Sequence, residues 1–444
     1  MVYNGDEVSG IVVDFGSHTT RAGYAGEDCP RVVCPSFYGY TVEPSSSNTD
    51  THDNTDVSMD GKGNKEARRR LYVGDDGVGI WRAGMEVGNF MMDGVVIEPE
   101  PAAALLHHVL RDRLSVDPRE HPLMLTEPAW NTSKARETLS EIVFEVEGAP
   151  AMYLGSSGVL SAFAAGKPTA LVLDIGYSNS RTMRQPLASS LLLSQLHHHF
   201  TNPTPSRSPL SLLPRLLVSK RDPTPEPGMQ PKPIVRTDRA SHSTASWQAW
   251  AQQGVVENWK EACGELVNHR GFDFRSARDL PQTLFEFPDG YHQYFGEERY
   301  RFTEMLFDPK RYFNQSIVPP MPLRTVPSTS QSHSLKELVP LSQLVHDSIM
   351  ACDVDVRAAL LQNIVVVGNT SLTRGLVERL DVELAGLMPS QKIKIHAPTI
   401  PFERKYSAWL GGSVLASLGT FHQLWVTKDE YEEHGIAVVH QRCK

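Results

Sequence analysis

A short motif that occurs twice constrains the fold of this chain more than any other feature. Residues 11–16 read IVVDFG and residues 171–176 read LVLDIG, so each copy is an apolar run that ends in Asp, one apolar residue and Gly. Such apolar runs are typical of buried strands. Copies about 160 residues apart are too distant for a solenoid repeat. Because one core rarely grows beyond roughly 250–300 residues, the spacing indicates a duplicated domain in two lobes.

Two such turns, facing each other across a cleft, can hold a polyphosphate from both sides. Their backbone N–H groups would bind the oxygens, and Asp14 and Asp174 at the strand ends would hold a hydrated Mg²⁺. A third glycine turn at 365–371, VVVGNTS, supports this interpretation. The alternative is that strand–Asp–x–Gly is merely a common way for a strand to end.

Composition narrows the class of protein. The net charge of -9 argues against a surface that binds nucleic acid on all sides, although it leaves room for a local basic patch. The five cysteines are scattered, without a C-x-x-C pair, which favours a reducing compartment over disulfides or a zinc site. Neither a signal peptide nor an apolar run of membrane-spanning length occurs. The sequence therefore predicts a cytosolic or nuclear protein.

Three segments differ from the ordered α/β pattern of the rest. Residues 41–66 are polar and predict a flexible insertion. Residues 186–246 are rich in proline and serine, and we expect them to lie outside the packed core without fixed structure. A shorter loop covers 318–334. Elsewhere, helical periodicity predicts helices over 133–147, 340–350 and 375–388, the first of them capped by Asn131, Thr132 or Ser133.

The motifs resemble a known family. Residues 14–36 are similar to the first phosphate loop of actin, residues 171–176 to the start of the second, and residues 365–380 to the loop and helix beside the adenosine. Residues 402–435 resemble the C-terminal region of actin almost residue for residue. The chain thus resembles actin and the actin-related proteins over about 1–40, 70–183 and 284–444.

Within that superfamily the chain is most similar to the nuclear actin-related protein 4 class, through residues 125–137, 285–299 and 348–363. The resemblance implies an α/β actin fold with two ribonuclease-H-like lobes around a nucleotide cleft. It assigns 1–40, 96–165 and 420–444 to the core of lobe one, 41–95 to a small insertion in it, 166–183 and 300–419 to the core of lobe two, and 184–299 to the insertion of lobe two.

The resemblance also implies a binding site for ATP and Mg²⁺, with Asp14 and Asp174 near the metal through water. The implied nucleotide-binding residues are Gly16, Ser17, His18, Thr19, Arg21, Gly176, Tyr177, Ser178, Gly368, Asn369, Thr370, Leu372, Thr373 and Lys405. His18 stands where actin has glycine, Arg21 where it has lysine and Tyr177 where it has aspartate. Arginine keeps the charge of lysine but changes the hydrogen-bond geometry.

Two departures from the family bear on activity. Ser157 occupies the position of the glutamine that orients the attacking water in actin, and serine is too short to orient a water from there. An alternative role for Ser156 and Ser157 is to cap a helix that begins near Val159. After residue 180 we match neither the β-hairpin nor the following helix of the family. Either the lineage lost these elements or the sequence carries a mistaken exon boundary, and in both cases the resemblance does not cover one wall of the nucleotide site.

The resemblance implies a subunit of chromatin-remodelling and histone-acetyltransferase complexes in the nucleus that binds ATP structurally without significant hydrolysis. The implied partners are monomeric actin, a helical segment of a remodelling ATPase, other subunits of these complexes, and histones or nucleosomal DNA. An apolar groove around Trp409 to Trp425 would suit the helical segment. The competing interpretations are an active, polymerising actin-like ATPase and, more distantly, a sugar kinase or chaperone of the same superfold.

Two small basic or histidine-rich motifs carry less information. The run His197-His198-His199 could bind a metal, but it has no partner carboxylate or cysteine nearby in sequence. The run EARRRL at 66–71 could contact DNA, yet a solvated entry into a strand is the simpler interpretation.

Overall fold

The structure is a computed structural model that describes residues 9–42, 69–178, 180–181, 184–185, 187–203, 207–223, 226–273, 279–314, 317 and 338–443. The insertion predicted at 41–66 lies outside the described residues from 43 onward, and the loop at 318–334 lies outside them entirely. Of the helices in these ranges, none combines the length and apolar character that a membrane crossing needs.

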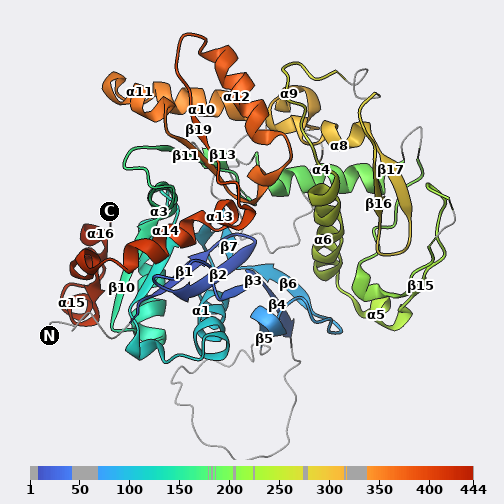
Figure 1. The fold of residues 1–444 in the computed structure, drawn as a ribbon. Helices are drawn as coiled ribbons and strands as arrows, with labels where there is room; N and C mark the ends of the chain where they lie inside the picture. The colour runs from blue at the N-terminus through green and yellow to red at the C-terminus, as the bar shows by residue number, and fades with distance from the viewer. Residues whose placement is uncertain are drawn as a thin grey trace, which may run out of the picture.

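A six-stranded sheet forms the centre of the first lobe (Figure 1). The apolar run at 11–15 forms β1 as predicted, with every residue buried, and β1, β9 and β10 run parallel. The strands lie in the order β20 (Val426–Thr427), β10 (Ala151–Ser156), β9 (Leu123–Glu127), β1 (Ile11–Phe15), β2 (Thr19–Tyr24) and β3 (Val32–Pro35).

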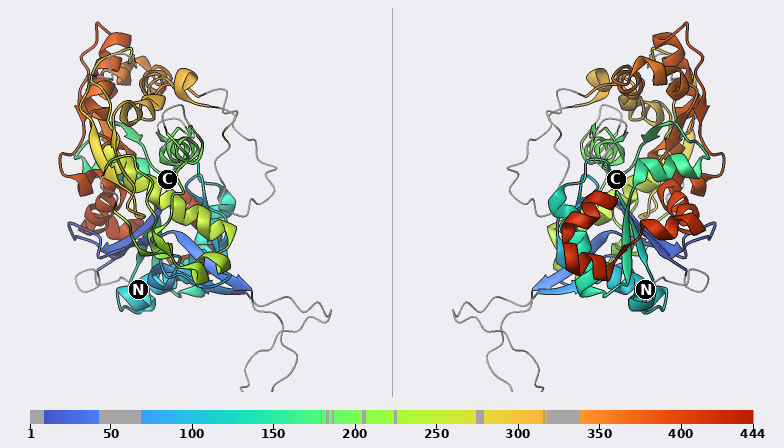
Figure 2. Two further views of the ribbon diagram at one scale, coloured as in Figure 1. Left: turned by 90° about the vertical axis from the view of Figure 1, so that its right-hand side faces the viewer. Right: turned by 90° about the vertical axis from the view of Figure 1, so that its left-hand side faces the viewer.

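Helices flank this sheet. The helix predicted over 133–147 is confirmed as α2 followed by a π-helical turn over Ile142–Val146, and Thr132 is its cap, because its side chain accepts a hydrogen bond from the Ala135 N–H. The red C-terminal helices lie against the blue and teal elements in Figures 1 and 2. The helices of this lobe are α1 (Pro99–His107), α2 (Ser133–Glu141), α3 (Ser157–Ala164), α15 (Lys428–His434) and α16 (Ile436–Arg442). Helix α14 (Ser407–Ala416) lies in the range that the resemblance assigned to lobe two, but it packs on α3 and β1 of this lobe.

The second lobe is built around a smaller parallel sheet. Its strands lie in the order β11 (Leu171–Asp174), β18 (Ile364–Val367) and β19 (Ile395–His396), so the second copy of the motif again ends a strand. Unlike β1, β11 is only partly buried, with Leu173 as its one fully buried residue. The helices predicted at 340–350 and 375–388 are confirmed as α10 (Leu341–Met350) and α12 (Leu376–Leu387). Each lobe has its own large apolar core.

The remaining strands and helices complete the fold, and α13 lies with α14 between the two sheets (Figure 1). The strands are β4 (Phe37–Val42), β5 (Arg69–Tyr72), β6 (Glu86–Asn89), β7 (Met91–Met92), β8 (Val95–Val96), β12 (Ser180–Arg181), β13 (Arg184–Gln185), β14 (Val218–Lys220), β15 (Ile234–Val235), β16 (Thr283–Glu286) and β17 (His292–Phe295). The helices are α4 (Ser189–Thr201), α5 (Thr237–His242), α6 (Ala245–Cys263), α8 (Glu297–Arg301), α9 (Pro309–Tyr312), α11 (Val354–Leu361) and α13 (Pro401–Lys405).

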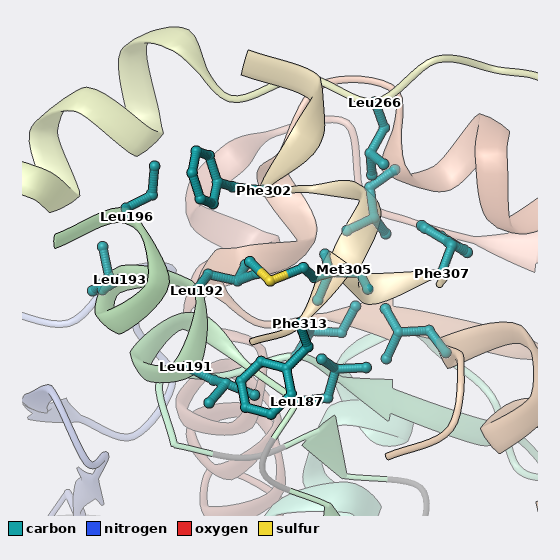
Figure 3. Packing of buried hydrophobic residues seen from close by; sticks show 14 of the residues in the cluster. Leu187, Leu191, Leu192, Leu193, Leu196, Leu266, Phe302, Met305, Phe307 and Phe313 are labelled. Atoms are coloured by element: carbon teal, nitrogen blue, oxygen red, sulfur yellow. The ribbon is translucent and has the colours of Figure 1, made fainter. Parts of the chain in front are cut away.

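The expectation that 186–246 lies outside the core is wrong. Helix α4 begins this segment, and Figure 3 shows its Leu191, Leu192 and Leu196 on the side of Phe302, Met305 and Phe313 in the second core. Leu192, Leu196 and Phe200 recur every four residues, which places them on one helical face. The high proline content of the whole segment hid this short periodic stretch.

The expectation that the family's hairpin and helix are both missing is also wrong. A reduced hairpin is present, because β12 pairs antiparallel with β13, two residues on each strand. Helix α4 then packs against α6. Lys260 of α6 is buried, and its Nζ donates a hydrogen bond to Ser189 Oγ at 2.5 Å, which joins the two helices.

Candidate functional site

A cavity of about 270 Å³ lies where β1, β11 and β18 end. It brings together most of the residues that the sequence proposed for the nucleotide and metal. These are Asp14, Gly16, Ser17, His18, Thr19, Arg21, Asp174, Gly176, Tyr177, Ser178, Gly368, Asn369 and Lys405. Leu372 and Thr373 instead line a neighbouring cavity of about 500 Å³, which shares Glu261, Asn369 and Lys405 with the first.

The first turn is held tightly from within. The N–H of Gly16 donates to Thr19 O at 3.2 Å, and the N–H of Ser36 donates to His18 O at 3.0 Å. A Cβ on Gly16 would lie 2.7 Å from Thr19 O, which is too close for any side chain. Glycine at this position is therefore required by the turn itself.

The register of β1 and β2 places a cation beside Asp14. Asp14 and Arg21 are directly opposite each other, and Arg21 Nη1 lies 2.6 Å from Asp14 Oδ2. The other carboxylate oxygen, Oδ1, accepts a hydrogen bond from Thr126 Oγ1 at 2.5 Å. Arg21 also donates to Thr19 Oγ1 at 2.8 Å. Each oxygen of Asp14 thus has one protein partner and retains a lone pair for a water on a metal ion.

The second turn is held by the third. Gly368 has φ 90°, and a Cβ there would lie 2.5 Å from both Asp174 Oδ1 and Ile175 O. The N–H of Thr370 donates to Ile175 O at 3.1 Å, and its Oγ1 donates to Gly176 O at 2.9 Å. Thr370, which the sequence proposed as a ligand residue, does not line the cavity. Its contacts position the second turn.

The two turns meet across the cleft. The hydroxyl oxygens of Ser17 and Ser178 lie 2.9 Å apart, and the rings of His18 and Tyr177 are tilted with centroids 4.9 Å apart. His18 Nε2 also lies 3.1 Å from Glu257 Oε2 on α6. Tyr177 is surrounded by protein, and this burial raises the pKa of its hydroxyl. Two of the residues that depart from actin, His18 and Tyr177, therefore make direct contacts between the lobes.

Helix α6 supplies a wall that the sequence analysis missed. Glu257, Asn258 and Glu261 line the cavity, and Asn369 Nδ2 donates to Glu261 Oε1 at 3.1 Å. Burial opposes ionisation of Glu257, but the hydrogen bond and charge of His18 outweigh it, so the pKa of Glu257 is lowered. The i, i+4 spacing places Glu257 and Glu261 on one face of α6, but the sequence does not show which part of the fold that face meets.

Ser157 does not line the cavity between the turns. It is the first residue of α3 and is buried, and among the described residues that line the cavity α3 contributes Ser161 rather than Ser157. The capping interpretation is wrong in detail, because α3 begins at Ser157 rather than near Val159 and the cap residue Ser156 makes no side-chain capping hydrogen bond.

Acidic and histidine side chains form no dense metal centre in the described ranges. No group of three or more His, Cys, Asp or Glu there could hold a metal ion. His197 Nε2 lies 3.1 Å from Gln252 Oε1. His199 lies edge-on to Phe302 with ring centroids 5.1 Å apart, and burial lowers its pKa to about 4. Arg69 of the basic run at 66–71 lies in β5 and stacks on Tyr40 at 4.2 Å.

Comparison with known proteins agrees with the fold and the paired turns. Residues 5–444 match the family model described as Actin, and the chain belongs to the actin family. Its α/β architecture is therefore the actin fold. The match also confirms the family resemblance found in the sequence.

Several relatives match over their full length. The chain is 35% identical to a protein named Actin-related protein 4 from Mycosarcoma maydis, with 100% of this chain and 99% of the relative covered. A protein of the same name from Schizosaccharomyces pombe is also 35% identical, with 100% and 99% covered. One from Oryza sativa subsp. japonica is 32% identical, with 100% of both chains covered. These relatives support an actin-related protein rather than a polymerising actin.

Proposed function

We propose that the chain is a nuclear, non-filament-forming actin-related subunit of chromatin-remodelling and histone-acetyltransferase complexes, which binds ATP as a structural ligand. The main observation in favour of ATP binding is that two glycine turns face each other across one cavity. The similarity to proteins named Actin-related protein 4 supports the assignment to this branch of the family.

The residues around the cavity fit a magnesium-bound nucleotide. Arg21, Arg404 and Lys405 supply positive charge, and the hydroxyls of Ser17 and Ser178 supply polar contacts for phosphate oxygens. Asp14 and Asp174 would hold the hydrated Mg²⁺, which would neutralise phosphate charge near these carboxylates. The neighbouring cavity, which Asn369 and Lys405 also line, has room for the ribose and base.

The position of Ser157 supports retention of the nucleotide over turnover. Phosphoryl transfer to water depends on a side chain that orients the water in line with the bond that breaks. Ser157 is short, buried and absent from the cavity lining. A retained nucleotide stabilises the folded state by mass action, as any ligand of the folded form does.

An apolar groove supports the proposed contact with a helical segment of a remodelling ATPase. A hollow of about 400 Å³ runs along α13 and α14, lined by Phe402, Leu410 and Val414 among others. Phe402 and Val414 are exposed there. Trp409 and Trp425, which mark the groove in the sequence, are buried and do not line it. Helix-in-groove binding uses such a surface, and monomeric actin is the proposed neighbour in the complex.

Two measurements test the proposal. Mg-ATP added to the purified chain should raise its melting temperature while phosphate release stays negligible. Absence of a thermal shift at millimolar ATP overturns nucleotide binding, and turnover accompanied by sedimenting filaments favours the active, polymerising alternative. Affinity purification from nuclear extract should recover actin and remodeller subunits, and recovery of the chain alone contradicts the proposed assembly.

A further inference from the structure

A second large cavity, of about 860 Å³, lies apart from the nucleotide cleft. Its walls come from the β14–β15 hairpin, the start of α5, Trp250 of α6 and Gly79. Among the described residues, the two cavities share no lining residue. Among the described residues that line this cavity, four are arginines and none is acidic: Gly79, Arg215, Leu216, Val218, Ser219, Arg221, Arg236, Arg239, Trp250 and Pro288.

The four arginines differ in how many of their guanidinium N–H groups already have a hydrogen-bond or ion-pair partner in the protein. Arg239 donates to Leu216 O at 3.2 Å and lies over Trp81, and Arg221 lies 3.0 Å from Glu286 Oε1. Arg215 and Arg236 are exposed, and no described residue forms an ion pair or hydrogen bond with their guanidinium groups. Two guanidinium forks are therefore free to bind carboxylate or phosphate in a bidentate manner.

This concentration of positive charge is unusual for a chain with a net charge of -9. It marks the cavity as a site for an anionic ligand by charge complementarity. The size of the cavity and its apolar side chains restrict the class of anionic ligand further. Leu216, Val218 and Pro288 offer apolar contacts, and Trp250 is half-buried at the wall. A free phosphate would use neither the volume nor the apolar side chains.

The surroundings favour a polypeptide over nucleic acid. A duplex binds through a run of phosphates along an extended basic surface, whereas exposed Asp238 and Glu286 interrupt the positive charge: Asp238 lies between Arg236 and Arg239 in sequence, and Glu286 pairs with Arg221. An extended peptide alternates its side chains, so it can place carboxylates on the arginines and an apolar residue on Trp250.

We propose that this cavity binds an acidic peptide segment of a partner protein, whose carboxylates pair with Arg215 and Arg236 while an apolar side chain rests on Trp250. The proposal is independent of the nucleotide and of the groove along α14. It adds a second docking surface that uses a different part of α6 from the cleft, because Trp250 lies on the first half of the helix and Glu257 on the second.

The test uses the full chain and a short fluorescein-labelled peptide in which Glu alternates with Leu, followed by fluorescence anisotropy. The double variant Arg215→Glu, Arg236→Glu should weaken binding about tenfold or more, because it replaces two attractive charges with repulsive ones. The matched double reversal Lys134→Glu, Lys310→Glu, at exposed lysines elsewhere, should change binding less than about twofold, since distant charges are screened. Equal losses in both variants overturn the proposal.

Two further binding measurements test which class of ligand occupies the cavity. Trp250→Ala should weaken the Glu–Leu peptide but leave a Glu–Gly peptide of equal charge unaffected, and circular dichroism confirms that the variants are folded. If duplex DNA binds more tightly than the peptide and loses affinity in the Arg215→Glu, Arg236→Glu variant, the occupant is nucleic acid and the proposal is wrong. The proposal is also wrong if the wild-type chain binds neither peptide.

Discussion

The two copies of the strand–Asp–x–Gly motif share a sequence pattern but differ in what surrounds them. The first copy sits in a six-stranded sheet, and the antiparallel strand that follows it brings Arg21 directly opposite Asp14. The second copy sits in a three-stranded parallel sheet, where the neighbouring strand β18 leads into Gly368 beside Asp174. One aspartate therefore has a cation from its own hairpin, and the other has a glycine turn from a distant part of the chain.

This difference determines which contacts of the two motifs can be foreseen from the sequence. In an antiparallel hairpin the partner of a residue lies a few positions away, so the pairing of Asp14 with Arg21 is encoded locally. In a parallel pair the connection is long, and the contacts of Asp174 depend on residues nearly two hundred positions later. Substitutions in the two lobes should therefore lower the free energy of unfolding by different amounts. The largest loss is expected for a substitution in the second lobe.

The second lobe should depend on α4 as strongly as on its sheet. Phe200 is fully buried, and its ring lies 5.1 Å from that of Trp259 and 5.7 Å from that of Phe287. Phe200→Ala should lower the free energy of unfolding by about 3–5 kcal/mol, because it removes buried surface and leaves a cavity. Urea unfolding followed by circular dichroism measures the change.

A control for this prediction lies in the same proline-rich segment. Met229 is 45% exposed, so Met229→Ala should change the free energy of unfolding by less than about 0.5 kcal/mol. If Phe200→Ala is as mild as the control, then α4 is not part of the core and 186–246 contributes little to the packing of the second lobe.

The fold was more predictable than the site. The apolar runs at 11–15, 171–174 and 364–367 form the three strands that lead into the turns. They could be predicted because a short continuous apolar run is typical of a strand in a sheet that is covered on both faces. Helix α4 was missed because composition was averaged over a window far longer than the helix. A window of about the length of the helix shows the four-residue spacing of Leu192, Leu196 and Phe200 and would have predicted it.

The site was only partly predictable, for a similar reason. The turns themselves could be found because each follows a strand that is visible in the sequence. The wall that Glu257 and Glu261 form could not, because it depends on how α6 is placed against the turns by contacts such as Lys260 with Ser189. Tertiary packing, rather than any local pattern, sets that placement.

The first turn should depend on its buried ion pair. Arg21 and Asp14 have side chains that are 14% and 10% exposed. Arg21→Met should lower the free energy of unfolding by about 2–3 kcal/mol, because it leaves a largely buried carboxylate without its cation. Arg21→Lys keeps the charge and should cost less. Urea unfolding measures both variants, and equal effects of Met and Lys would show that the charge of Arg21 is irrelevant to stability.

Acidification should destabilise the second lobe through α4. Burial, followed by the charges of Arg207 and Arg301, lowers the pKa of His199 to about 4, whereas an unfolded histidine titrates near 6.5. The unfolded chain then binds the proton more readily, so stability is lost as pH falls from about 6.5 toward about 4.

A leucine at this position removes that loss. Relative to wild type, His199→Leu should recover about 1–2 kcal/mol between near-neutral pH and about pH 5, measured by urea unfolding at each pH. The exposed neighbour provides a milder comparison: the charge of His198 is the last of the causes that lower the pKa of His199, so His198→Leu should change the pH dependence much less than His199→Leu. An unaltered pH dependence in His199→Leu would mean that this side chain is hydrated in the folded state.

The smallest effect concerns the contact between the turn of the first copy and helix α6 of the other lobe. His18 Nε2 and Glu257 Oε2 lie 3.1 Å apart, with side chains 38% and 15% exposed, and they join the first turn to the wall of the other lobe. A half-exposed pair of this kind contributes about 0.2–1 kcal/mol. The measurement is a double-mutant cycle of His18→Ala and Glu257→Gln, followed by urea unfolding at a pH above the titration of Glu257, where the lowered pKa of that carboxyl keeps it ionised. The two losses should be less than additive in the double variant, because either substitution alone already breaks the contact. Strict additivity would show that this contact does not couple the first turn to α6, and that each is positioned by its own lobe.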